Sequence, residues 1–184
     1  LAGDEAYVFT QMEPIDARAA FPGFDDPQFK TPFEVTVVAP EGDFVVSNAR
    51  LVSRGPAGKG LVRHRFAPTL PLPTYLVALA VGPLDVAEGQ PIAAHDVERP
   101  PIPQRGIATR GQGPKLTYVL EHTPAIVTAL EDYFGIAYPY PKLDQIASPA
   151  MPGAMENAGA VIYGDSLLLL GADAPPAQLR GFYE

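Results

Sequence analysis

Five consecutive residues near the end of the chain combine small side chains with one carboxylate: Gly153-Ala154-Met155-Glu156-Asn157. A predicted strand over residues 143–147 precedes them, and an apolar stretch over residues 160–170 follows. Small residues let another backbone approach closely, and a carboxylate beside them can hold a cation such as a peptide amino terminus. The string therefore predicts an edge strand or loop that lines a cleft, with Glu156 as its charged group.

Residues 1–96 have the pattern of a β-rich domain. Phe33, Val35 and Val37 alternate with polar residues, which is typical of a half-buried strand. Turn signals separate further predicted strands, and prolines make residues 68–73 extended. This spacing favours a sandwich or saddle-like sheet. The further strands are predicted at 44–47, 51–53, 61–66 and 74–81, with a loop at 55–60.

Residues 97–184 begin with a predicted linker at 100–103 and a predicted strand at 106–110. After these, the apolar residues change to helical spacing. Apolar residues recur every three or four positions over 116–134, which indicates a helix. Pro124 should kink this helix or restart it with Thr123 as the N-cap, and Gly135 should end it. Strands at 143–147 and 160–164 and a helix opening at Pro175-Pro176 complete a β-rich α+β prediction.

The composition limits the kinds of partner. The chain has 184 residues, a net charge of −8 and 47% hydrophobic residues, which is enough for a core. The acidic balance argues against nucleic acid and against anionic membrane surfaces as partners. The longest apolar runs are too short to span a bilayer. Because the chain has no cysteine, it has neither a disulfide framework nor a thiolate metal ligand.

The string at 153–157 resembles the GAMEN motif of the M1 family of zinc aminopeptidases, and three other segments occur in the order that this family shows. The first contains Thr10-Gln11-Met12-Glu13-Pro14, Asp16-Ala17-Arg18 and Phe21-Pro22-Gly23-Phe24-Asp25-Asp26-Pro27. The others are Phe29-Lys30-Thr31-Pro32-Phe33 and Tyr138-Pro139-Tyr140-Pro141-Lys142-Leu143-Asp144. Together the matches span nearly the whole chain, so it is identified as resembling an aminopeptidase N-like member of the family.

The resemblance implies how a peptide with a free amino terminus would bind. Glu156 would grip the α-ammonium of the substrate, and Gln11 and Glu13 would contribute to the same amine site. A bound cation would lower the cost of holding both carboxylates ionised close together. The substrate backbone would pair with the motif strand, a form of strand addition. The motif residues assigned to substrate binding are Gly153, Ala154, Met155, Glu156 and Asn157.

Each of these assignments has a structural alternative. Glu156 taken alone is an exposed loop acid, and Gln11 and Glu13 can form a solvent-facing strand edge before a proline. A tight turn would also require the small residues at 153 and 154. Met155 suits a core or pocket wall, and Asn157 suits a turn.

Several other residues are expected to be structural. We expect Arg18 to pair with a carboxylate and anchor the loop over residues 16–27, and the candidate carboxylates are Asp25 and Asp26. Tyr138 and Tyr163 are expected in core packing, with a pocket wall as the alternative.

The zinc-binding pattern of the family is missing from the sequence. His-Glu-x-x-His places two ligands and a general base on one helical face, and it does not occur here. The histidines, His64, His95 and His122, are far apart in the sequence and are expected to be isolated surface or loop residues. By resemblance the zinc motif follows GAMEN, so we expect a fragment that ends just before it. Such a fragment would have no catalytic residue, bind no metal and be inactive alone, with zinc only in the parent.

The resemblance also implies a domain organisation. Residues 1–96 would be the C-terminal part of an amino-terminal β domain, and residues 97–184 the truncated start of a thermolysin-like catalytic domain. The parent would be a metallo-aminopeptidase that removes N-terminal residues from peptides, although epoxide hydrolysis also occurs among such enzymes. The alternative is a non-catalytic, β-rich interaction module on the same scaffold. Missing partner strands and helices would expose apolar surface, so self-association is expected.

Overall fold

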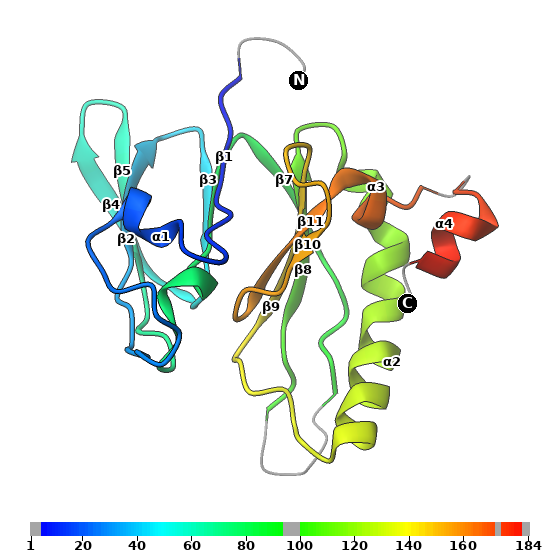
Figure 1. Cartoon of the computed structure of the whole chain (residues 1–184). Helices are drawn as coiled ribbons and strands as arrows, with labels where there is room; N and C mark the ends of the chain where they lie inside the picture. Colours follow the sequence, from blue (N-terminus) through cyan, green and yellow to red (C-terminus); the bar gives the residue numbers. More distant parts are fainter. Residues whose placement is uncertain (1–4, 94–99, 172–173, 182–184) are drawn as a thin grey trace. The chain divides into compact units, whose positions relative to one another are not determined.

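The computed structural model describes residues 5–93, 100–171 and 174–181, without the side chains of 180 and 181. The chain forms two compact units (Figure 1). Unit 1 comprises Leu1–Leu84 and Met155–Ala160, and unit 2 comprises Asp85–Ala154 and Val161–Glu184. The expected domain limit at 96 lies in the segment 94–99, outside the described residues.

Unit 1 contains two antiparallel three-stranded sheets within its described residues. One has the order β1-β6-β3, formed by Val8–Phe9, Leu79–Gly82 and Phe44–Ser47. The other has the order β2-β5-β4, formed by Thr36–Pro40, Leu61–Phe66 and Leu51–Gly58. A buried cluster joins strands of both sheets, which is the packing of a sandwich. Its members are Ala39, Val45, Ala49 and Phe66.

Three predicted strand boundaries in unit 1 are wrong. The strand expected from Phe33 begins at Thr36, and the predicted loop at 55–60 is mostly strand, because β4 and β5 meet in a tight turn at Gly60, whose φ is 69°. The strand expected over 74–81 is a 3₁₀ turn, η1 (Thr74–Leu76), followed by β6. Apolar content alone did not distinguish the two, since the turn is also packed inside the unit.

The loop after α1 (Ala17–Ala20) is anchored as expected, by Asp25. The Arg18 Nε donates to the Asp25 carboxylate at 2.5 Å, and the Thr74 hydroxyl donates to its other oxygen at 2.7 Å. These hydrogen bonds, from Arg18 first and then Thr74, hold the pKa of Asp25 below its ordinary value. The Arg18–carboxylate pair is therefore confirmed, and Asp26 instead caps the local turn through Gln28.

His64 contradicts the expectation of a surface or loop histidine. It lies in β5 with only 3% of its surface exposed, on the inward face that it shares with Phe66. Burial, with a smaller contribution from the Arg54 charge, lowers the pKa of His64 below 6.5 because both disfavour the imidazolium. The alternation along β5, exposed at Arg63 and Arg65 and buried at His64, fixes this orientation.

The His64 pKa predicts an acid-dependent loss of stability in unit 1. In the unfolded chain His64 takes up a proton at about pH 6.5, whereas in the folded chain it does so only at lower pH. The contribution of His64 to the free energy of unfolding therefore has its full value above pH 6.5 and decreases as the pH drops below it. Urea unfolding between pH 7.5 and 5.5 should therefore show a weaker pH dependence in His64→Gln than in wild type. Val38→Ser, which changes an exposed residue of β2 in the same unit and no titratable group, is the control and should keep the wild-type slope. Equal slopes in all three proteins would contradict the prediction.

Unit 2 is built on a five-stranded sheet of order β10-β11-β9-β8-β7. The central strands β8 and β9 run parallel, with Arg105 opposite Asp144. Figure 1 shows the long helix α2 alongside this sheet. The strands are Ala154–Met155, Ala160–Gly164, Leu143–Ser148, Gln104–Thr109 and Leu84–Glu88, and the helical elements are η2 (Gly113–Leu116), α2 (Thr117–Phe134), α3 (Asp165–Leu168) and α4 (Pro176–Gly181).

Helix α2 packs on β8 and β9 through one buried cluster, which includes Ala108, Val119 and Ala147. The helix continues through Pro124, so the predicted restart at that residue is wrong. Thr123 is not an N-cap, because its hydroxyl donates to the Val119 carbonyl at 2.8 Å inside the helix. Gly135 ends the helix in the left-handed conformation, as predicted, with a φ of 64°.

The predicted linker at 100–103 also belongs to the packed structure. Ile102 is 2% exposed and forms a bridge with Ile92, so it joins a buried cluster with Leu143. The strands predicted at 143–147 and 160–164 and the helix after Pro175 are confirmed. More of the described residues lie in β-strands than in helices, so the β-rich α+β prediction is confirmed.

Within the described ranges, we find no helix whose length and apolar content would allow it to cross a membrane.

Candidate functional site

Glu156 is the exposed residue of an otherwise buried run between β10 and β11. Met155 is 1% exposed, and Asn157 and Ala158 are 2% and 3% exposed. Buried neighbours on both sides fix the backbone at Glu156 while the carboxylate faces solvent. The motif therefore presents its acid on a rigid support.

Gln11 and Glu13 show the same arrangement in a different segment. Both are exposed, and Met12 between them is 4% exposed. They follow β1 rather than lie in it, and the Asp16 amide closes a turn by donating to the Met12 carbonyl at 2.9 Å.

Neither carboxylate is paired within the described part of the chain: Glu13 and Glu156 form no ion pair with any residue there. By contrast, the buried carboxylates of Asp25 and Asp144 each bind at least one cationic side chain. Two solvent-facing carboxylates without an internal cation are suited to bind an external one.

Both acid-bearing segments belong to unit 1. Hydrogen bonds connect one of them directly to Leu79 and the other, through Asn48, to the preceding residue, Ala78. Thr10, three residues before Glu13, exchanges hydrogen bonds with Leu79: the Leu79 amide donates to its hydroxyl at 2.9 Å, and its own amide donates to the Leu79 carbonyl at 3.1 Å. Ala158, two residues after Glu156, accepts a hydrogen bond from Asn48, whose carbonyl oxygen binds the amide of Ala78. Two segments that are far apart in the sequence are thus both connected to the chain at Ala78 and Leu79.

Ala154 begins β10, the outermost strand in the order of the five-stranded sheet, and Gly153 directly precedes it. Ala154 is exposed, and a Cβ added to Gly153 would meet no atom within 4 Å. Internal packing therefore does not require glycine at 153. Internal packing does require glycine at Gly164, because the Met151 carbonyl oxygen fills the position that a Cβ would take. The Gly164 amide donates to the Gly153 carbonyl at 2.7 Å.

Met155 and Asn157 do not face solvent. Both are buried, and the Asn157 side-chain amide donates back to the Met155 carbonyl at 3.3 Å. The backbone also turns here, because the Ala160 amide donates to the Asn157 carbonyl at 3.0 Å. The two residues support the motif backbone on either side of Glu156.

Among the described residues, the histidine, aspartate and glutamate side chains form no group of three or more that could hold a metal ion. His64 is buried in β5, His122 stacks on Tyr118 in α2, and His95 lies outside the described residues. The described side chains therefore do not fit the zinc that the resemblance implies, and no chemical step is assigned to a metal here.

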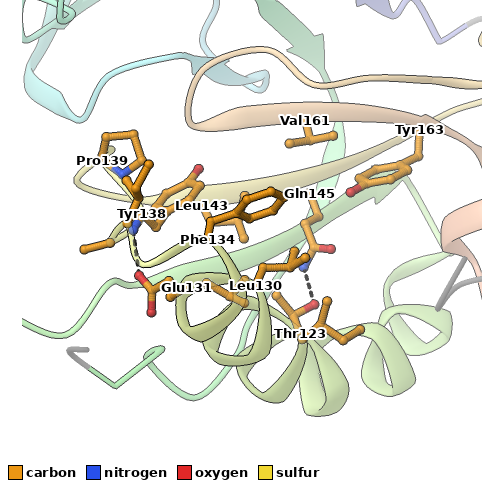
Figure 2. Close-up of a pocket in the computed structure, with 14 residues that line it drawn as sticks. Thr123, Leu130, Glu131, Phe134, Tyr138, Pro139, Leu143, Gln145, Val161 and Tyr163 are labelled. Carbon is orange, nitrogen blue, oxygen red and sulfur yellow. Dashed lines mark hydrogen bonds between the residues drawn. The ribbon is translucent and has the colours of Figure 1, made fainter.

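Unit 2 also has an apolar groove of about 470 Å³ between the last turns of α2 and strands β9 and β11 (Figure 2). Tyr138 and Tyr163 line it and are partly buried, so they serve both as groove wall and as packing. Inside the groove, the Gln145 amide donates to the Thr123 hydroxyl at 2.9 Å. None of the candidate site residues lies in this groove.

Sequence reasoning missed the residues that hold the acids in place. Asn48 is 3% exposed and forms three hydrogen bonds, yet in the sequence it is one asparagine between two strands, where a turn is the ordinary expectation. Thr10 was visible only as part of a longer motif. No local signal distinguishes such residues, because their partners are distant in the sequence.

Comparison with known proteins gives two separate family matches. Residues 2–76 match the Peptidase M1 N-terminal domain, and residues 118–180 match the Peptidase family M1 domain. Aminopeptidase N of Acetobacter pasteurianus is 36% identical over 87% of this chain and 43% of its own length. Endoplasmic reticulum aminopeptidase 1 of Homo sapiens is 32% identical over 93% of this chain and 18% of its own length.

A plant relative gives the same result: Aminopeptidase M1-A of Oryza sativa subsp. japonica is 35% identical over 87% of this chain and 17% of its own length. The chain spans less than half the length of each of these relatives.

Proposed function

Because this chain belongs to peptidase family M1, we propose that it carries the amine-recognition part of a metallo-aminopeptidase. The observation that supports this most is the exposure of Glu156 between the buried residues Met155 and Asn157, without an ion-pair partner among the described residues. Glu13 has the same exposure and belongs to the same unit. We also propose that residues 1–96 and 97–184 derive from the amino-terminal and catalytic domains.

The α-ammonium group of the substrate peptide binds to Glu156 and Glu13, with Gln11 as a further hydrogen-bonding group. A charge-assisted hydrogen bond to each carboxylate satisfies the ammonium and offsets the repulsion between the two acids. The same contacts set the position of the peptide, because its first peptide bond lies a fixed distance from the amine. A peptide without a free amino terminus therefore loses both affinity and alignment.

The substrate backbone adds to the free edge of β10 at Gly153 and Ala154. An edge strand offers unpaired amide and carbonyl groups to an extended peptide. The open space beside Gly153 leaves room for this approach, and Ala154 adds only a methyl group. Met155 and Asn157 contribute by holding the motif backbone rather than by touching the substrate.

The family implies zinc in a full-length protein that includes this chain. Because the described residues offer no group of ligands, we propose that the chain alone binds no stoichiometric zinc and hydrolyses no peptide. Metal analysis of the purified chain tests the first statement, and one tightly held zinc per chain would refute it.

Substrate pairs test the function of the full-length protein. Hydrolysis rates are compared for peptides that differ only in a free or an acetylated amino terminus. The proposal expects cleavage of the first residue from free peptides and strong discrimination against acetylated ones. Equal cleavage of both would exclude the amine-gripping role, and absence of any cleavage would favour the non-catalytic interaction module.

We further propose that the isolated chain associates with itself through the α2 groove. Large apolar side chains are exposed there: Leu130, Phe134 and Ile136 have exposed fractions of 50%, 65% and 70%. Figure 2 shows Leu130 and Phe134 at the groove between α2 and the sheet. A contiguous apolar surface of this kind favours burial against a second copy.

Sedimentation of the isolated chain over a concentration series tests this association. Wild type should shift toward dimer at high concentration, and Phe134→Ser should remain monomeric because it removes the most central exposed ring. Val38→Ser, which removes an exposed apolar side chain from unit 1, is the control and should behave as wild type. A monomeric wild type at all concentrations would contradict the proposal.

A further inference from the structure

The side chain of Asn48 uses both of its N–H donors and its carbonyl oxygen on backbone groups of unit 1. Its Nδ2 donates to the Leu76 carbonyl at 2.7 Å and to the Ala158 carbonyl at 2.9 Å. Its Oδ1 accepts from the Ala78 amide at 2.8 Å. Only 3% of the surface of Asn48 is exposed, so its side chain interacts with the protein and not with solvent. Its role is therefore to make these three hydrogen bonds.

The bond to Ala158 is the long-range one, because it joins residues 110 positions apart. Ala158 follows Glu156 by two residues, and Asn157 between them is buried. Only Asn157 lies between Glu156 and Ala158, whose carbonyl is held by Asn48. The position of Ala158 therefore limits where Glu156 can lie.

Asn48 is itself held by the β1-β6-β3 sheet. It directly follows β3, in which Ser47 pairs with Leu79 of β6. Leu79 is also the residue to which Thr10 binds from the β1 side. The segments that carry Glu13 and Glu156 are therefore attached to one end of β6 from opposite sides, through Thr10 and Asn48.

We propose that Asn48 is a positioning residue that sets Glu156 against Glu13 for amine recognition. This inference rests on the proposed function, and it adds a residue that does not touch the substrate. Asparagine suits this position because one amide supplies two donors and one acceptor. Alanine would leave the carbonyls of Leu76 and Ala158 and the amide of Ala78 without these partners, and the Glu156 backbone would be free to shift.

The test uses the full-length protein and the ratio of kcat/KM for a free peptide to that for its acetylated form. A displacement of about 1 Å at a recognition group can reduce the rate roughly 100-fold, so Asn48→Ala should lower kcat/KM for the free peptide by roughly 10- to 100-fold. The rate for the acetylated peptide should change little, so the ratio falls. Asp25→Asn, which disturbs another buried hydrogen-bond network of unit 1, is the control and should lower the melting temperature without changing the ratio.

The double variant Asn48→Ala/Glu156→Ala separates positioning from general damage. If Asn48 acts through Glu156, the double variant should have the same ratio as Glu156→Ala alone. Independent, multiplying effects would overturn the inference, and so would an unchanged ratio in Asn48→Ala. If Asn48→Ala does not fold, Asn48→Ser keeps a smaller donor and acceptor and is measured in the same way. A wild type without amine preference would instead overturn the proposed function, which is a distinguishable result.

Discussion

Replacing Glu156 with alanine should reduce kcat/KM of the full-length protein for free peptides by roughly 100-fold. In the proposed site the carboxylate supplies a charge-assisted hydrogen bond to the substrate ammonium, and its loss would leave that ammonium partly unpaired, at a cost of about 3 kcal/mol in the transition state. The effect should be large because Glu156 is held between buried neighbours and cannot be replaced by another residue of the motif. Steady-state kinetics with paired free and acetylated peptides measure it.

Two further variants make this result specific. Glu156→Gln keeps the size of the side chain and its hydrogen-bonding oxygen, so it should recover only the part of the rate that does not depend on charge. Glu34→Ala removes another exposed acid of unit 1 and should leave kcat/KM unchanged. If Glu34→Ala and Glu156→Ala reduce the rate equally, the effect comes from net charge rather than from a specific contact, and the role of Glu156 is wrong.

The fold could be predicted where the local pattern and the tertiary environment agree. In the predicted strand at 143–147, Leu143, Ile146 and Ala147 are apolar and buried, and the buried Asp144 and Gln145 have hydrogen-bond partners. The segment 74–81 is apolar after its first residue but turns at Thr74–Leu76, because its backbone binds Asn48 and its first hydroxyl binds Asp25. Contacts between residues this distant in sequence leave no local pattern.

The candidate site also contains residues that could be predicted from the local sequence and residues that depend on distant contacts. The motif residues and the exposed acids were identified from the sequence, since their types and spacing match a recognisable family pattern. The histidine expectation failed at His64 because period-two burial in β5 depends on pairing with both β2 and β4. Asn48 was missed for a related reason: its function depends on Ala158, and only the folded chain brings the two together.

Removing the charge of Asp144 should cause the largest loss of stability in unit 2. Asp144 is 0% exposed and accepts hydrogen bonds from Arg105 Nε at 2.8 Å and Nη2 at 2.6 Å and from Lys142 Nζ at 2.7 Å. Asp144→Asn preserves the shape of the side chain but leaves two cations around a neutral amide. Breaking a buried ion pair from one side costs about 3–5 kcal/mol, and the partial exposure of Arg105 favours the lower end of this range.

Urea unfolding of the chain, followed by circular dichroism, measures this change. Glu121→Gln, an exposed acid on α2, is the matched control and should change the free energy of unfolding by less than about 0.5 kcal/mol. Because Arg105 and Asp144 face each other across the parallel pair β8 and β9, the ion pair also links the two central strands of the sheet. Similar small changes in both variants would mean that water solvates the cations in place of Asp144, and the pairing of these strands would then depend on apolar packing alone.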